Sequence, residues 1–244
     1  MWEAVGVSHG LTGKPVCQDY HLLERLDNDV LAIAVSDGAG SALHAEIGSE
    51  TACRAAIGFL KDTHSNRKLY DENALDIVLA GVKAARKAVE EEASRRKLPV
   101  RDFSATFVLV LSIGSTVTVA QVGDCMVVAE TQTGEVIALT TPSRGEYANE
   151  TTMLTSADAL KSINSFQCCE PIQCIAVMTD GLLPITTIAP FYRPSVKTFP
   201  GLFAYSKGWS NREEAIAELT GFLTSDRVQQ GTGDDLTLVL ARRR

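Results

Sequence analysis

Four aspartates stand where expected strands begin or end, and together they could bind a metal ion. Asp37 and Asp180 each follow an apolar run and precede a glycine, Asp19 precedes an expected strand, and Asp234 lies between Gly233 and another strand. Three or more carboxylates at one edge of a sheet, with a backbone carbonyl, offer the oxygen ligands that Mg²⁺ and Mn²⁺ prefer. A single Asp-Gly pair is usually a turn. The repeated pattern therefore indicates a hard-cation site, but it names no substrate.

The stretch from Leu31 to Gly48 shows how such an aspartate would be positioned. Residues 31–35 (LAIAV) form a continuous apolar run, which is typical of a buried strand. The turn 36–40 (SDGAG) follows, and its glycines permit close backbone approach. A helix is expected after Ser41, which can act as its N-cap. Asp37 and Gly38 could thus present a carboxylate and a carbonyl to one cation. The alternative is that Asp37 is only a turn or cap residue.

The composition favours a folded domain without a nucleic-acid or membrane surface. The chain has 244 residues, of which 45% are hydrophobic and 22% charged, and its formal net charge is -7. That charge argues against nucleic acid or an anionic membrane as the main partner. We see no signal peptide at the start and no apolar run of the roughly 18 residues that a spanning helix needs. The six scattered cysteines suit reduced thiols, so we expect a cytoplasmic protein.

The remaining pattern predicts a single α+β domain over residues 1–244. Strands are expected at 3–8, 20–24, 31–35, 172–178 and 236–240, and helices at 41–61, 73–97 and 210–224. Four β-rich segments at 104–113, 116–122, 126–131 and 135–139 predict an antiparallel meander. Residues 140–165 are expected to form a flap or loop region. The segment 184–210 is rich in proline and lacks periodicity, so we interpret it as an insertion or lid outside the core.

The order of motifs along the chain carries a family resemblance. G-x-x-x-K-x-x-x-Q-D, V-S-D-G-A-G-S, Q-V-G-D-C, M-T-D-G-L and G-D-D-L-T follow one another, beginning at Gly10, Val35, Gln121, Met178 and Gly233. This order resembles the metal-dependent type 2C (PPM) protein serine/threonine phosphatases, and more narrowly their compact bacterial branch. The motifs span nearly the whole chain. The resemblance implies a four-layer α-β-β-α sandwich, in which two packed antiparallel sheets are flanked by helices.

By position, the resemblance also implies roles for individual residues. Asp37 would bridge two Mn²⁺ or Mg²⁺ ions, Gly38 would offer its carbonyl, and Asp180 and Asp234 would complete the metal shell. Asp19 would orient the attacking water. Asp102 would hold a third, weaker metal ion. Lys14 stands where the family has an arginine that holds the substrate phosphate, and a lysine keeps the charge but loses the bidentate fork. Arg144, in the expected flap at about 142–155, would contact a phosphopeptide.

Three departures from the family pattern affect the expected chemistry. Gln18 replaces an acidic residue often found before the aspartate at this position, so one anionic contact is lost. Ala39 stands where animal-type members have a histidine proposed as general acid, so metal-bound water would have to protonate the leaving alkoxide. Cys125-Met126 replaces the family's Ser-Arg, so we expect Asp124 to serve the fold more than the chemistry.

The function implied is hydrolysis of phosphoserine or phosphothreonine by a water that bridges two metal ions, without a covalent intermediate. The chain contains no Cys-x5-Arg phosphatase loop, which argues against covalent cysteine catalysis. The expected partner is a phosphorylated protein, and we expect a monomer. Two alternatives stay open: a non-catalytic module that keeps a metal and binds phospho-ligands, and a hydrolase of small phosphoesters.

Overall fold

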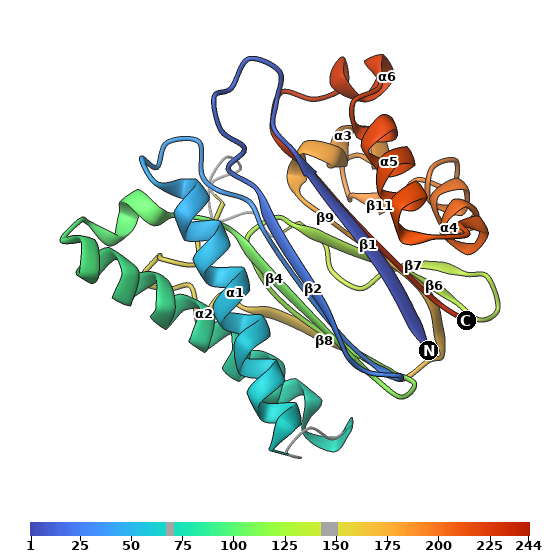
Figure 1. The fold of residues 1–244 in the computed structure, drawn as a ribbon, viewed down its shortest axis with the longest axis horizontal. Coiled ribbons are helices and arrows are strands. Elements are labelled where there is room, and N and C mark those ends of the chain that lie inside the picture. The colour runs from blue at the N-terminus through green and yellow to red at the C-terminus, as the bar shows by residue number, and fades with distance from the viewer. Residues whose placement is uncertain (67–70, 143–150) are drawn as a thin grey trace.

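Two five-stranded antiparallel sheets pack face to face, and helices cover both outer faces (Figure 1). The computed structural model describes residues 1–66, 71–142 and 151–244. In the first sheet the strand order is β1-β12-β9-β6-β7, and in the second it is β2-β3-β4-β5-β8. The first sheet contains β1 (Trp2–His9), β12 (Leu236–Arg243), β9 (Ile172–Met178), β6 (Met126–Thr131) and β7 (Val136–Ala138). The second contains β2 (Tyr20–Asp27), β3 (Val30–Ser36), β4 (Phe107–Ile113), β5 (Thr116–Val122) and β8 (Asn164–Cys168).

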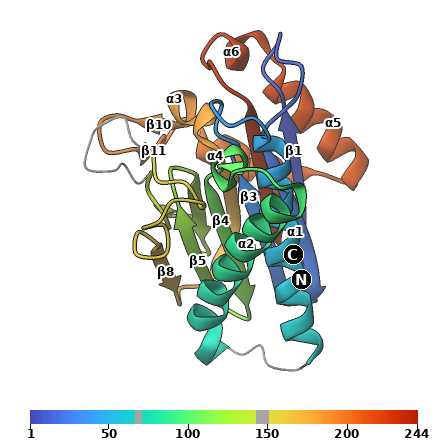
Figure 2. The same ribbon diagram turned by 90° about the vertical axis from the view of Figure 1, so that its left-hand side faces the viewer.

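Three apolar layers hold these sheets and helices together. The long helices α1 (Ala45–Ser65) and α2 (Ala74–Arg96) cross the outer face of the second sheet (Figure 2). The helices α4 (Phe199–Gly208) and α5 (Arg212–Leu223) lie on the other outer face, together with the short α3 (Leu183–Thr186) and α6 (Asp226–Gln229). The third apolar layer fills the space between the sheets. The expected four-layer sandwich is therefore confirmed.

The packing of strand β3 explains why its residues are apolar on both faces. Ala32 and Ala34 face the layer under α1 and α2, whereas Leu31, Ile33 and Val35 face the layer between the sheets. Both faces of the strand are fully covered, so each of these side chains gains from leaving water. The small alanines let α1 approach the sheet, and the larger residues fill the interior. This rigid central strand carries Asp37 at its end.

The expected meander is wrong, because its four strands divide between the two sheets. Strands β4 and β5 belong to the second sheet, and β6 and β7 belong to the first. The chain crosses between the sheets at residues 123–125. Gly123 has a φ of +101°, and a Cβ there would lie 2.7 Å from the Thr106 side chain, so glycine alone fits. The crossover leaves Asp124 between the ends of two strands.

The second half of segment 184–210 belongs to the core, in contrast to the expected insertion or lid. Phe199 and Phe203 of α4 are fully buried against the first sheet, and Trp209 follows them. The first half forms α3 and the short hairpin of β10 (Thr187–Ile188) and β11 (Arg193–Pro194). Four prolines and a short helix hide the helical period, so the sequence pattern gave no signal for α4.

Helix α1 begins later than expected. Its N-cap is His44, and Ser41 lies in the preceding turn. That turn is held by the segment after α2: the Ala39 N–H donates to the Ser104 carbonyl at 2.9 Å, and the His44 N–H donates to the Asp102 carbonyl at 2.7 Å. The neighbouring segment, which includes the 3-10 helix η2 (Val100–Phe103), thus satisfies the His44 N–H, which a Ser41 cap would otherwise satisfy.

All six cysteines are free, and four of them are buried, as expected. Among the helices in the described ranges, none combines the length and the apolar character that a bilayer crossing requires.

Candidate metal centre

Three carboxylates from both sheets meet at one end of the sandwich. Asp37 follows β3, Asp180 follows β9, and Asp124 lies in the crossover between β5 and β6. One oxygen of each lies within 4.8 Å of the others, and all three residues are half-buried. Oxygen donors alone, without thiolate or imidazole, suit Mg²⁺ or Mn²⁺ and do not suit a structural zinc site. We refer to these residues as the acidic cluster.

The acidic cluster is electrostatically unfavourable without a cation. Burial, aided by the charges of Asp124 and Asp234, raises the pKa of Asp180 to about 6. Burial and the nearby charges of Asp19 and Asp180 also raise the pKa of Asp37 well above its usual value. In addition, the buried Oδ1 of Asp180 has no hydrogen-bond partner among the described residues. A divalent cation would relieve the repulsion and satisfy the unpaired oxygen, so the acidic cluster fits a metal ion.

Asp19 lies behind the acidic cluster and is almost fully buried. Its Oδ2 accepts hydrogen bonds from Thr179 Oγ1 at 2.8 Å and from Thr237 Oγ1 at 2.9 Å. Its Oδ1 has no partner within the described part of the chain, and the carboxyl of Asp37 is a direct neighbour. Burial raises the pKa of Asp19 to about 7, although the two threonine hydroxyls act in the opposite direction. One oxygen is therefore fixed, and the other remains available for water or a cation.

Lys14 pairs with two further aspartates, Asp234 and Asp235. Its Nζ is 2.6 Å from Asp234 Oδ1 and 3.5 Å from Asp235 Oδ1. Burial acts to lower the pKa of Lys14, but the bond to Asp234 and the two negative charges outweigh it and raise the pKa. The side chain of Asp234 is about half exposed (47%). The ammonium group of Lys14 thus pairs with the carboxylate of Asp234, which the family resemblance assigns as a metal ligand.

Asp235, which directly precedes β12, holds the loop that carries Lys14 by two hydrogen bonds. This carboxylate is buried, and its two oxygens accept the backbone N–H groups of Leu11 and Gln18, both at 2.8 Å. The carbonyl of Gln18 in turn accepts from the N–H of Gly38 at 3.1 Å and from Ser49 Oγ at 2.7 Å. The backbone at Gln18, rather than its side chain, therefore connects the strand ends of both sheets.

Two glycines allow the strand ends to approach each other. A Cβ on Gly38 would lie 2.6 Å from the Gln18 carbonyl oxygen, and a Cβ on Gly181 would lie 2.2 Å from the Asp235 carbonyl oxygen. Gly38 also forms an isolated antiparallel bridge with Ala105, whose two hydrogen bonds use the neighbouring residues. The carbonyl of Gly38 takes no part in that bridge.

The acidic cluster differs from the sequence expectation at two positions. Asp124 belongs to it, although we expected this residue to serve the fold, and its Oδ2 also accepts from Thr151 Oγ1 at 2.8 Å. Asp102 does not belong to the cluster that the described residues form; its carbonyl holds His44, and its carboxylate lies 4.0 Å from Arg101. The signal for Asp124 was the same strand-then-aspartate pattern that identified Asp37. Arg144 lies outside the described residues.

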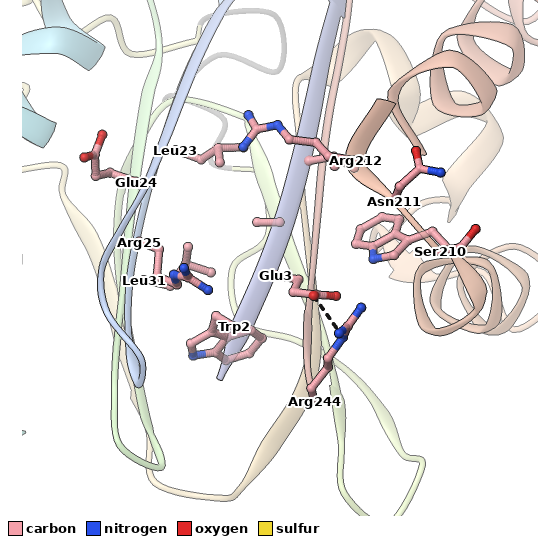
Figure 3. Close-up of a pocket in the computed structure, with 13 residues that line it drawn as sticks. Trp2, Glu3, Leu23, Glu24, Arg25, Leu31, Ser210, Asn211, Arg212 and Arg244 are labelled. Carbon is pink, nitrogen blue, oxygen red and sulfur yellow. Dashed lines mark ion pairs between the residues drawn. The ribbon is translucent and has the colours of Figure 1, made fainter. Parts of the chain in front are cut away.

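A cavity of about 290 Å³ opens beside the acidic cluster. Asp124 and Asp180 form one part of its wall, and residues of the segment 183–192, including Leu183 and Tyr192, form another. A larger groove of about 460 Å³ lies along the edge strands β1 and β2 (Figure 3). That groove contains Trp2, Arg212 and the Glu3–Arg244 ion pair, but none of the cluster carboxylates. Of these two hollows, the smaller cavity is the one that reaches the acidic cluster.

Comparisons with known proteins agree with this geometry. The family model described as "Protein phosphatase 2C" matches residues 5–224. Serine/threonine-protein phosphatase 3 of Escherichia coli (strain K12) is 32% identical over 253 residues, covering 98% of this chain and 95% of that protein.

Two solved structures share the fold. Serine/threonine phosphatase Stp1 from Staphylococcus aureus has a TM-score of 0.69 at 14% identity, covering 100% of this chain and 96% of that one. The catalytic domain of the serine threonine protein phosphatase PstP, solved with two manganese ions, has a TM-score of 0.66 at 17% identity, covering 99% and 97%.

Proposed function

The chain belongs to the protein phosphatase 2C family, and on that premise we propose that the acidic cluster is the metal centre of a phosphoserine and phosphothreonine phosphatase. The match covers nearly the whole chain, and the relative that is 32% identical is named a serine/threonine-protein phosphatase. The proposed substrates are phosphorylated proteins. The proposed cofactor is Mn²⁺ or Mg²⁺, two ions with a third bound more weakly.

The observation that carries this proposal is the meeting of Asp37, Asp124 and Asp180 from two sheets within 4.8 Å. Bound divalent ions would supply a nucleophilic water at neutral pH and would stabilise the negative charge of the transferred phosphoryl group. Asp37, whose carboxyl lies near those of Asp19 and Asp180, is the proposed bridging ligand. The Gly38 carbonyl and Asp234 are proposed as further ligands, and Asp124 replaces Asp102 as the candidate for the third ion.

Asp19 and Lys14 have separate proposed roles. The free Oδ1 of Asp19, beside Asp37, can accept a hydrogen bond from the attacking water and orient it. Lys14 is held by Asp234 at 2.6 Å. If Asp234 instead faces a cation, the ammonium of Lys14 becomes available to the substrate phosphate. Ala39 offers no acidic side chain, so water in the cavity would protonate the leaving alkoxide.

The test is hydrolysis by the purified protein of an aryl phosphate and of a phosphothreonine peptide, with and without Mn²⁺. We expect Mn²⁺-dependent release of phosphate from both. Hydrolysis of the aryl phosphate alone would favour a small-molecule phosphoesterase, and metal binding without any hydrolysis would favour a binding module. Free cysteines support a reducing compartment such as the cytoplasm, and the monomeric state stays a prediction that gel filtration can check.

A further inference from the structure

A chain of hydrogen bonds leads from Asp19 away from the acidic cluster into the space between the sheets. Thr237 Oγ1 lies 2.9 Å from Asp19 Oδ2, Ser8 Oγ lies 2.7 Å from Thr237 Oγ1, and His21 Nδ1 lies 2.8 Å from Ser8 Oγ. The four residues belong to β1, β2 and β12 or directly precede β2. The chain therefore links residues that are up to 229 positions apart in sequence.

The number of available protons fixes the direction of this chain. Thr237 Oγ1 donates its single hydroxyl proton to Asp19 Oδ2. Thr237 can then only accept from Ser8, and Ser8 has no second proton for His21. The remaining bond forms only if Nδ1 of His21 carries a hydrogen and donates it to Ser8. Every proton in the chain therefore points toward Asp19.

The surroundings of His21 are built to hold its ring in this place. Opposite the ring lies Gly6 of β1, where a Cβ would come within 2.5 Å of His21 Cδ2 and 2.6 Å of Nε2. Any larger residue at position 6 would displace the imidazole. His21 shares its face of β2 with Leu23, which lines the β1–β2 groove near Arg212 (Figure 3). The ring is thus enclosed at the edge of the layer between the sheets.

Thr179, the second residue that donates a hydrogen bond to Asp19 Oδ2, is also held in place. Thr179 Oγ1 donates to Asp19 Oδ2 at 2.8 Å and accepts from the N–H of Thr237 at 3.0 Å. Two hydroxyls from the ends of β9 and β12 thus hold one oxygen of the carboxylate. They determine its rotation and leave Oδ1 beside Asp37.

We propose that His21 is a positioning residue for catalysis, acting through Ser8 and Thr237 to hold the carboxylate of Asp19 in the orientation that directs Oδ1 at the attacking water. The catalytic part of this inference rests on the proposed phosphatase function. The hydrogen-bond direction does not, and it can be measured without substrate or metal.

The first test is the protonation of His21 Nδ1, measured by ¹⁵N NMR on histidine-labelled, metal-free protein at pH 8. A His21→Asn variant assigns the signal among the four histidines. We expect a protonated Nδ1, and Ser8→Ala should shift its resonance. An unprotonated Nδ1 would overturn the proposal.

The second test is a double-mutant cycle on kcat for an aryl phosphate at saturating Mn²⁺. His21→Leu and Thr237→Val should lower kcat roughly 10- to 100-fold, as loss of a supporting hydrogen bond does, with KM almost unchanged. His21→Asn, which keeps a donor near the Nδ1 position, and Thr237→Ser should retain most of the activity. In an Asp19→Asn background, His21→Leu should cause no further loss.

An equal loss from His21→Leu in both backgrounds would show a general structural role and overturn the proposal. If the wild-type protein hydrolyses neither phosphate substrate, the proposed function fails. The NMR measurement still determines the direction of the hydrogen bonds between His21 and Asp19. The two failures are therefore distinguishable.

Discussion

Asp37 and Asp180 belong to different sheets, yet their carboxyl oxygens lie within 4.8 Å of each other and of Asp124. The layer between the sheets fixes this relationship, because β3 and β9 are buried on both faces and carry the two residues at their ends. The geometry of the acidic cluster therefore depends on how the two sheets pack, and not on one loop.

Replacing Asp37 by asparagine should remove the bridging charge with little change in shape. We expect Mn²⁺-dependent hydrolysis of an aryl phosphate to fall by at least about 100-fold, the effect of losing a major electrostatic contribution to the transition state. Asp27→Asn, at an exposed position at the end of β2, is the matched control and should retain the wild-type rate. A rate for Asp37→Asn close to wild type would remove the acidic cluster from the mechanism.

Substitutions at Asp124 and Asp102 should affect the binding of the weaker metal ion differently. Asp124→Asn should increase the Mn²⁺ concentration needed for half-maximal activity by roughly 10-fold or more, because a carboxylate of the acidic cluster is lost. Asp102→Asn should leave that concentration unchanged, since its carboxylate lies outside the acidic cluster in the described structure. Activity measured across a Mn²⁺ series distinguishes them, and the reverse order would restore the role that the sequence assigned to Asp102.

The metal-free protein should lose stability as the pH rises. The folded-state pKa of Asp180 is about 6, above its ordinary value of 3.8, so the folded protein binds more protons than the unfolded chain between these values. The resulting stability is complete below about pH 4 and is lost as the pH rises through about 6. Urea unfolding in EDTA should therefore give a lower free energy of unfolding at pH 8 than at pH 5.

The variant Asp180→Asn isolates this contribution, because other groups also titrate in the same range. Its free energy of unfolding should fall less between pH 5 and pH 8 than that of the wild type. Mn²⁺ should raise the stability of the wild type at pH 8. An identical pH dependence in both proteins would contradict a pKa of Asp180 that burial raises.

Gly181 should tolerate no side chain. An added Cβ would meet the Asp235 carbonyl oxygen at 2.2 Å, so Gly181→Ala must displace the segment that carries Asp180 or the one that carries Asp234. We expect a loss of about 1–3 kcal/mol in the free energy of unfolding and weaker Mn²⁺ binding by calorimetry. Gly58→Ala, inside α1 with open space around it, should instead gain up to about 1 kcal/mol. If Gly181→Ala and Gly58→Ala changed the free energy of unfolding equally, the close approach of Gly181 to the Asp235 backbone would be unimportant.

Lys14 should affect phosphate binding more than the chemical step. Lys14→Met removes the ammonium but keeps much of the side-chain length, so inhibition by inorganic phosphate should weaken several-fold, while Lys14→Arg should preserve or strengthen it. Inhibition constants at fixed Mn²⁺ provide the measurement. Unchanged inhibition in Lys14→Met would mean that Lys14 only neutralises Asp234 and Asp235.

The sequence predicted those parts of the fold that local patterns determine. The continuous apolar run before Asp37 and the periodic apolar positions of α1 and α2 gave strands and helices close to their true bounds. The division of β4–β5 and β6–β7 between two sheets could not be predicted, because a tight turn and a crossover both contain Gly-Asp. Strand β8 was missed since four of its five residues are exposed and lack an apolar pattern.

The site was predicted where a residue's own motif was informative. Asp37 and Asp180 stand at strand ends in sequence and meet in space. Asp124 also follows a strand in sequence, but we assigned it to the fold because Cys125-Met126 departs from the family's Ser-Arg. Its proximity to Asp37 and Asp180 depends on the crossover, which is a tertiary property. The chain from Asp19 through Thr237 and Ser8 to His21 depends on contacts between strands at opposite ends of the sequence. No single-sequence pattern reports such contacts.

The most direct test of the central claim is a crystal structure of the Mn²⁺-soaked protein with anomalous difference maps. We predict two strong peaks that share a carboxylate oxygen of Asp37, one of them also contacting Asp180, with any third and weaker peak beside Asp124. Peaks elsewhere, with none in contact with Asp37, in a protein that hydrolyses phosphopeptides would contradict the assignment of the acidic cluster as the metal centre.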